Sequence, residues 1–164
     1  MNMITNLFRV VREPENSGVS MGPGPTWEIG RVEDAPAFFR ALADLLPEGS
    51  ILYLEDTCSK EGVTLLTRLA VNPQLRLVLG TIWPRPNFFH IPFNSAVASE
   101  LAEFAEHHAT PEIGIHLHAY RGEEILLEWY DAFGARLRIS ASIPEARIRH
   151  FCDLLHCKYA LESV

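Results

Sequence analysis

The sequence predicts a single α+β domain over residues 1–164, with a mixed sheet, helices packed mainly on one face, and a C-terminal three-stranded antiparallel meander. Three observations carry this prediction. Helical apolar stripes follow residues suited to capping, alternating runs lie between them, and three strand-like runs follow one another closely after residue 111. A chain of 164 residues with 48% hydrophobic and 21% charged residues can bury one sizeable core.

The N-terminal part contains two expected strands separated by a loop. Residues 3–12 alternate as a strand does, and residues 27–32 form a second short run. Between them, residues 13–26 hold three prolines and three glycines without an apolar period. This composition predicts a flexible loop, and loops of that length in compact domains are disordered or functional.

Helices and strands are expected in turn through the middle of the chain. Each of the three helices should start after a residue whose side chain can cap it: Asp34, Ser59 and Asn94. Strands or extended segments are expected between the helices, over residues 50–55, 75–83 and 88–93. Between the last two of these segments, Trp83-Pro-Arg-Pro86 should form a stiff connection that fixes loop geometry or shapes a pocket wall.

The C-terminal part is expected to be a meander followed by a helix. The meander strands cover residues 112–120, 124–132 and 135–142, with tight turns at Gly122 and Gly134. A capping box, Ser142-Ile-Pro-Glu145, should start a last helix whose apolar stripe runs to Tyr159 and includes Cys152.

Strand alternation predicts which side chains share each face of the meander. If both turns are two-residue loops, residues of opposite parity pair across the strands. One face should then present a set of aromatic and polar side chains: His116, His118, Tyr120, Trp129, Asp131, Arg136 and Arg138. Leu117, Tyr130 and Ile139 should lie on the core face, together with Glu128, whose carboxylate would need a buried partner. A three-residue loop at either turn would reverse one strand.

This face has three interpretations. A solvated sheet face with ordinary cross-strand pairs is the first, because antiparallel sheets commonly face water on one side. A binding face is the second, since Trp129 and its apolar neighbours suit a covered surface. The third is a metal site formed by His116, His118 and Asp131, because two histidines and a carboxylate hold divalent transition metals in iron(II) oxygenases and some zinc hydrolases.

Composition excludes several other classes. A net charge of −7 argues against nucleic acid as the partner. The first residues lack the pattern of a signal peptide, and no apolar run approaches the length of a membrane span. Three cysteines, an odd number, favour a reducing compartment, so a cytoplasmic protein is expected. No phosphate-binding loop, nucleophile elbow or dinucleotide fingerprint occurs.

These observations favour a non-catalytic, acidic protein-binding module of the toxin-neutralising or adaptor kind, without a cofactor. Its partner would be another protein or a second copy of the chain, contacted through the aromatic and polar sheet face. The alternative is a metal-dependent enzyme with the His-x-His plus carboxylate site on that face.

Overall fold

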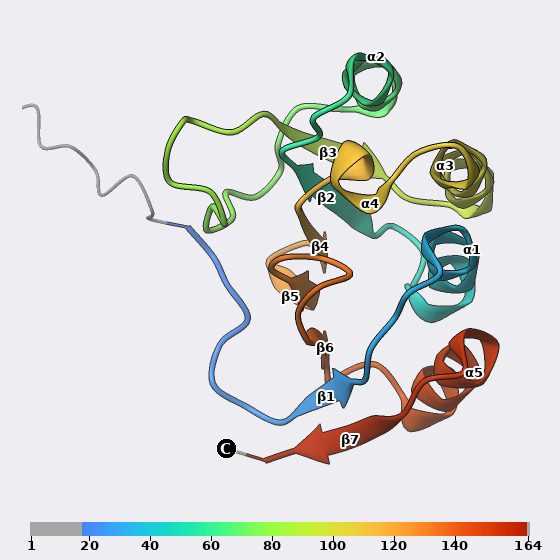
Figure 1. Ribbon diagram of the computed structural model, residues 1–164. Coiled ribbons are helices and arrows are strands. Elements are labelled where there is room, and N and C mark those ends of the chain that lie inside the picture. Colours follow the sequence, from blue (N-terminus) through green and yellow to red (C-terminus); the bar gives the residue numbers. More distant parts are fainter. Residues whose placement is uncertain (1–17, 164) are drawn as a thin grey trace, which may run out of the picture.

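The computed structural model describes residues 18–163, in which seven strands form one sheet of order β3-β2-β4-β5-β6-β1-β7 (Figure 1). The strands are β1 (Thr26–Ile29), β2 (Ile51–Glu55), β3 (Phe88–Pro92), β4 (His116–Arg121), β5 (Glu124–Trp129), β6 (Leu137–Ser140) and β7 (Tyr159–Glu162). The helices in this range are α1 (Ala35–Leu45), α2 (Lys60–Leu69), α3 (Ser95–Glu106), α4 (Thr110–Ile113) and α5 (Glu145–Leu155). The fold is therefore α+β, as the sequence predicts.

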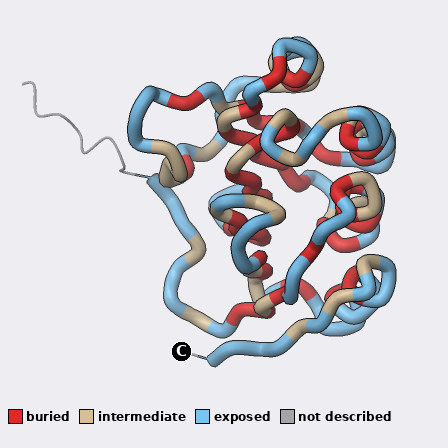
Figure 2. Tube along the Cα trace, in the orientation of Figure 1, coloured by how far each residue is buried: buried red, intermediate tan, exposed pale blue. Residues whose placement is uncertain are grey.

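The sheet lies between a layer of helices and a layer of irregular chain. Helices α1, α3 and α5 cover one face, and residues 18–25 and 70–87 run over the other (Figure 1). Both faces are largely buried, whereas the outer sides of the helices and loops are exposed (Figure 2). Among the described residues, no helix has the length and apolar character needed to span a membrane.

Three helix starts are confirmed as predicted. The side chains of Asp34, Ser59 and Asn94 each accept a hydrogen bond from the backbone N–H three residues ahead, at 2.8, 2.8 and 3.0 Å. The predicted capping box at Ser142 is wrong. The Ser142 backbone N–H and hydroxyl instead bond to the Ser140 hydroxyl in the preceding turn, and α5 begins without a side-chain cap.

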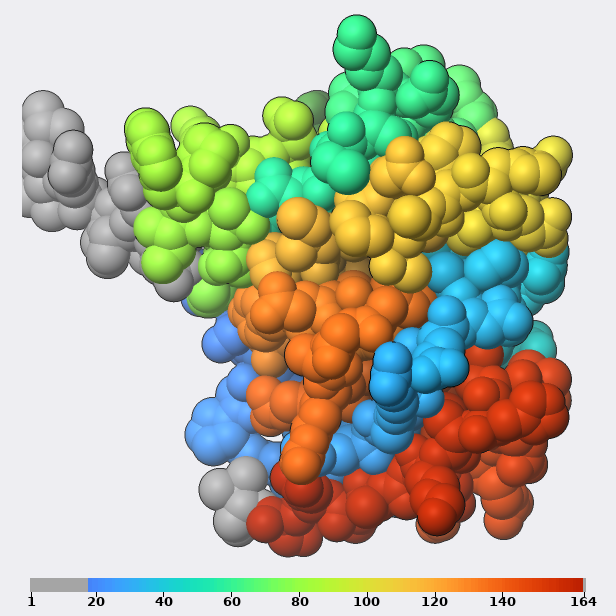
Figure 3. Space-filling model, viewed as in Figure 1, coloured from blue at the N-terminus to red at the C-terminus, as the bar shows by residue number. Residues whose placement is uncertain are grey.

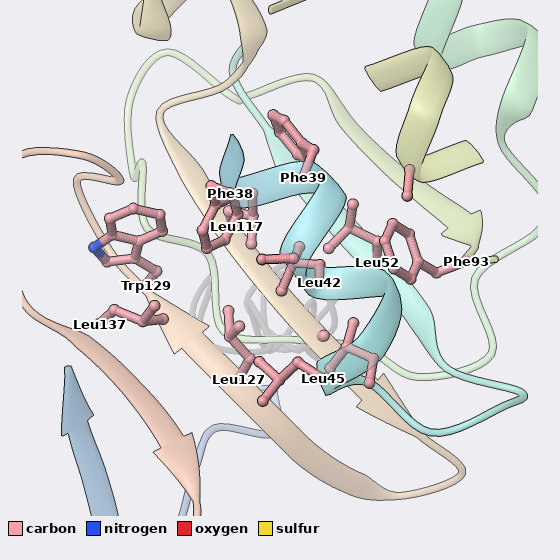
Figure 4. Close-up of a cluster of buried hydrophobic side chains, with 14 of the residues drawn as sticks. Phe38, Phe39, Leu42, Leu45, Leu52, Phe93, Leu117, Leu127, Trp129 and Leu137 are labelled. Atoms are coloured by element: carbon pink, nitrogen blue, oxygen red, sulfur yellow. The ribbon is translucent and has the colours of Figure 1, made fainter. Parts of the chain in front are cut away.

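The main core fills the space between the sheet and the helices. Figure 4 shows Phe38 and Leu42 of α1 facing Leu127 and Trp129 of β5. The rings of Phe38 and Trp129 lie 5.0 Å apart between centroids. Fully burying one such large apolar side chain contributes about 1.5–3 kcal/mol to stability, so this contact anchors α1 on the sheet.

The face assignment is correct for β4 and β6 but wrong for β5 from Leu127 onward. The first turn has the expected two-residue loop, because Tyr120 pairs with Ile125. One residue further along, a β-bulge shifts the register, so that Leu117 lies opposite Trp129. An extra residue reverses the alternation that follows it, which places Trp129 on the helix side and Glu128 on the histidine side.

The second turn contains a compensating departure. The predicted tight turn at Gly134 is a longer connection in which the backbone N–H groups of Gly134 and Ala135 both donate to the Asp131 carbonyl. As a result Glu128 pairs with Arg138 in β6. The two register changes cancel, so the residues of β6 keep their predicted faces.

Other elements also differ from the prediction. Residues 75–83 form no strand, only an isolated bridge between Leu77 and Val19. Helix α5 ends at Leu155, where His156 takes a left-handed conformation, and the chain returns to the sheet as the unpredicted β7. All pairings between the named strands are antiparallel, so the expectation of a mixed sheet is wrong. The predicted strand over 3–12 and the start of the 13–26 loop lie outside the described residues.

Candidate functional site

The two predicted site histidines lie side by side on β4 and are buried under the irregular layer. The backbone N–H of Asp131 donates to His116 Nδ1 at 3.0 Å, and that of Trp129 donates to His118 Nδ1 at 3.2 Å. A neutral imidazole that accepts at Nδ1 carries its proton on Nε2. The Nε2 atom of His118 is buried and has no hydrogen-bond partner within the described part of the chain.

His118 behaves as an uncharged, packed ring. Burial, with a smaller contribution from the neighbouring His116, lowers the pKa of His118 to about 3. Its ring stacks on Tyr53 at 5.5 Å and meets the edge of Tyr130 at 4.7 Å. Only 2% of the residue is exposed. The ring is therefore neutral near pH 7 and does not reach the surface.

The charged side chains on this face are paired within the protein. Glu128 accepts from Arg138 at 3.2 Å and from the backbone N–H of Met21 at 3.1 Å. Arg136 forms an ion pair with Glu28 at 2.8 Å on the exposed part of the face. The buried Glu128 thus has a charged partner, as the sequence called for, although Arg138 is only partly buried and the pair lies on the opposite face from the predicted one.

The metal interpretation lacks a third ligand in this geometry. Asp131 is exposed in the turn after β5, with a left-handed φ of 48°, and its backbone rather than its carboxylate contacts His116. Within residues 18–163, no group of three or more His, Cys, Asp and Glu side chains is arranged to hold a metal ion. Both Nδ1 atoms already accept backbone N–H groups. A metal at His116 and His118 stays a prediction.

The predicted binding face is only partly assembled. The structure brings His116, His118 and Tyr120 together on one face, but it buries all three. Trp129 lies on the other face, in the main core, and its inclusion in the site is wrong because of the β5 bulge. The chain's own residues 18–25 and 70–87 cover the face that the sequence left open.

A buried carboxylate that the sequence reasoning missed holds this cover in place. Glu55 is 0% exposed and accepts three hydrogen bonds. Its donors are the Tyr53 hydroxyl at 2.6 Å and the backbone N–H groups of Gly80 and Thr81 at 3.1 and 2.6 Å. Burial and the bond to Glu55 raise the pKa of Tyr53, so its hydroxyl remains a donor. Glu55 thus fixes the position of the chain at residues 80–81.

Two apolar side chains directly after this clamp are exposed. Ile82 is 66% exposed and Trp83 is 86% exposed, and prolines at 84 and 86 limit the conformations of the chain beyond them. Large apolar side chains in neighbouring positions on a held loop are typical of a contact surface. Figure 3 shows this segment, in yellow-green, at the molecular surface.

A pocket of about 670 Å³ lies between the sheet and the segment of residues 73–85, which includes Ile82 and Trp83. Tyr53, Phe88 and His90 line it from the sheet side. The remaining lining comes from the segment itself: Pro73, Leu75, Arg76, Leu77, Leu79, Ile82, Trp83 and Arg85. Residues 80–86 therefore join an exposed apolar surface to a hollow with aromatic and basic lining.

One signal in the sequence marks this region. Residues 62–99 contain three arginines and no aspartate or glutamate, although the whole chain has a net charge of −7. Trp83-Pro-Arg-Pro86 lies within that acid-free stretch. The two prolines predicted a stiff loop or a pocket wall here. The hydrogen bonds from Gly80 and Thr81 to Glu55 could not be predicted, because these residues are distant in sequence.

Comparisons with models of known protein families, with curated proteins and with solved structures give no significant match for this chain. Its function is therefore argued from the geometry of the site.

Proposed function

We propose that the chain is a non-catalytic protein-binding module of the cytoplasm, of the toxin-neutralising or adaptor kind. Its contact surface would be the loop that carries Ile82 and Trp83, in place of the buried sheet face. The exposure of Trp83, 86% on a clamped loop, is the observation that supports this proposal. Tryptophan is enriched among the residues that dominate binding energy at protein interfaces.

The charges around the loop favour a particular kind of partner. Residues 62–99 contribute only positive formal charge, so a partner with an apolar recess and carboxylates at its rim would complement them. All three cysteines are free thiols, which supports a reducing compartment such as the cytoplasm. A different protein is the proposed partner, because a second copy would add another net charge of −7.

The proposal is tested by capture from a lysate of the source cells, followed by reconstitution. The test variant replaces both Ile82 and Trp83 with Ser. The matched control replaces two exposed leucines elsewhere, Leu154 and Leu161, with Ser. Any protein retained by the wild type is then purified, and its affinity for each form is measured by titration calorimetry.

We expect the wild type and the leucine control to bind the purified partner alike. The loop variant should bind at least about 30-fold more weakly, the loss typical of a hot-spot residue. Its free energy of unfolding should stay within about 0.5 kcal/mol of the wild type, since both side chains are exposed. Equal affinities for the three forms, or no partner at all, would contradict the proposal. A loop-dependent change in oligomeric state would assign the surface to a second copy instead.

A further inference from the structure

The pocket beneath residues 71–87 has an aromatic floor. The rings of Tyr53 and Phe88 stack at 6.1 Å with an interplanar angle of 27°. The volume of about 670 Å³ falls within the range of pockets that hold drug-sized ligands. A flat apolar body placed against these two rings would bury much of its surface.

His90 adds a polar ring nitrogen to the lining. Its Nδ1 shares a hydrogen bond with the Tyr120 hydroxyl at 2.8 Å, and burial raises the pKa of that hydroxyl, which therefore keeps its proton. Burial lowers the pKa of His90 to about 4, which keeps the ring neutral near pH 7. When the hydroxyl donates to Nδ1, the ring carries its own proton on Nε2, and an anion placed at Nε2 favours this tautomer.

The charge of the lining is positive. Arg76 and Arg85 both line the pocket, and its described lining residues include no aspartate or glutamate. Glu55 bonds to Tyr53 but is outside this lining, and three donors already hold its two oxygens. The Arg85 guanidinium can bind a ligand carboxylate through two parallel hydrogen bonds.

We infer that this pocket binds a small aromatic carboxylate, with its ring against Tyr53 and Phe88 and its carboxylate at Arg85 and His90. A singly charged group fits this small donor set better than a phosphate, which carries more charge and more acceptor oxygens. The ligand is a free small molecule, because the hollow has the size of one. Ile82 and Trp83, the residues of the proposed protein contact, also line this pocket, so the variants below leave both side chains in place and test the pocket separately.

The test titrates the full chain with 2-naphthoate, and with 2-naphthamide as an uncharged compound of nearly the same shape. Binding is followed by calorimetry and by tryptophan fluorescence, since Trp83 lines the pocket. We expect 2-naphthoate to bind with a dissociation constant below about 1 mM and the amide to bind about 10-fold more weakly. Equal binding of the two compounds, or no binding of the carboxylate, would overturn the inference.

Two variants and one control locate the site. Arg85→Gln should weaken 2-naphthoate binding about 10-fold, as expected for loss of a charge-assisted hydrogen bond. Leu79→Trp, which adds bulk to the lining, should reduce it further. Arg149→Gln makes the same charge change at an exposed position on α5, on the opposite side of the sheet, and should leave binding unchanged. Equal losses for Arg85→Gln and Arg149→Gln would mean that only net charge matters and would overturn the site.

Discussion

Replacing Glu55 with Gln tests whether this buried carboxylate holds the irregular layer on the sheet. Glu55 accepts from the Tyr53 hydroxyl and the Gly80 N–H at Oε2, and from the Thr81 N–H at Oε1. Glutamine is nearly the same size but has one acceptor oxygen and one NH₂ donor. The substitution therefore changes hydrogen bonding and charge while leaving the packing volume almost unchanged.

The expected cost follows from these three bonds. If the amide oxygen stays at Thr81, the NH₂ group faces the Gly80 N–H, and donor opposes donor. If the amide is rotated, the NH₂ group faces the Thr81 N–H instead. In the first case the Tyr53 hydroxyl can rotate to accept from the NH₂ group, and in the second case it still donates to the amide oxygen. In either case one backbone N–H loses its partner. Loss of a hydrogen bond to a charged group, in a site that is 0% exposed, should cost about 2–3 kcal/mol of unfolding free energy.

Urea unfolding of the wild type and Glu55→Gln measures this difference. Hydrogen exchange should also become faster at the backbone amides of Gly80 and Thr81, because the clamp that protects them is weaker. Glu33→Gln is the matched control, since Glu33 pairs with Arg31 on the surface with both side chains more than 70% exposed. The control should change stability by less than about 0.5 kcal/mol. If Glu55→Gln were equally mild and left both amides protected, the clamp argument would be refuted.

Two further predictions concern β4. A Cβ atom on Gly80 would lie 2.2 Å from the His116 ring, so Gly80→Ala should cost about 1–3 kcal/mol in urea unfolding, whereas Gly22→Ala, with open space around it, should be nearly silent. Equal effects would show that the ring can move aside. Burial lowers the pKa of His118 from 6.5 to about 3, so between these values the unfolded chain binds a proton that the folded chain does not. The contribution of the neutral His118 to the free energy of unfolding is then complete above pH 6.5 and decreases toward pH 3. From pH 7 to 4.5 the wild type should lose about 2–3 kcal/mol more than His118→Gln, and parallel pH profiles for the two would contradict this.

The helix starts were predictable because their cause is local. Asp34, Ser59 and Asn94 each bond to a backbone N–H only three residues away. Such a bond needs no information about the rest of the fold, so the cap residue and the apolar stripe after it suffice. Helix α5 shows the limit of this reasoning. At Ser142 an equally local bond to Ser140 competed with the cap and formed instead.

The face of β5 was not predictable from alternation, because residues 125–127 are apolar without interruption. Ile125, Leu126 and Leu127 can place an apolar side chain on the core in either register. The bulge uses this freedom: Ile125 stays on the histidine face while Leu126 and Leu127 join the main core. The metal and binding-face predictions both depended on the register of β5. Because the bulge changes that register, Trp129 lies in the main core and not on the predicted binding face.

The run at 75–83 shows that apolar character reports burial and not sheet membership. Leu77 is buried against the sheet, yet its backbone pairs with Val19 of the N-terminal cover and not with the backbone of a sheet strand. The long-range contacts that decide this, from Val19 and from Glu55, are invisible in a local window. The absence of aspartate and glutamate from residues 62–99 is a sequence signal that does not depend on secondary structure, because a residue has the same formal charge in a strand or in a loop.

The buried clamp also explains how an irregular segment can present a defined surface. A carboxylate removed from water is tolerated only where donors surround it, and two of the three donors to Glu55 are backbone groups of the segment itself. Moving residues 80–81 would therefore remove two of the three donors to the carboxylate and leave two N–H groups without their acceptor. This cost holds Ile82 and Trp83 in place although neither side chain is buried. Stability and binding then separate by residue: changes at Glu55 should affect both, whereas changes at Trp83 should affect binding alone.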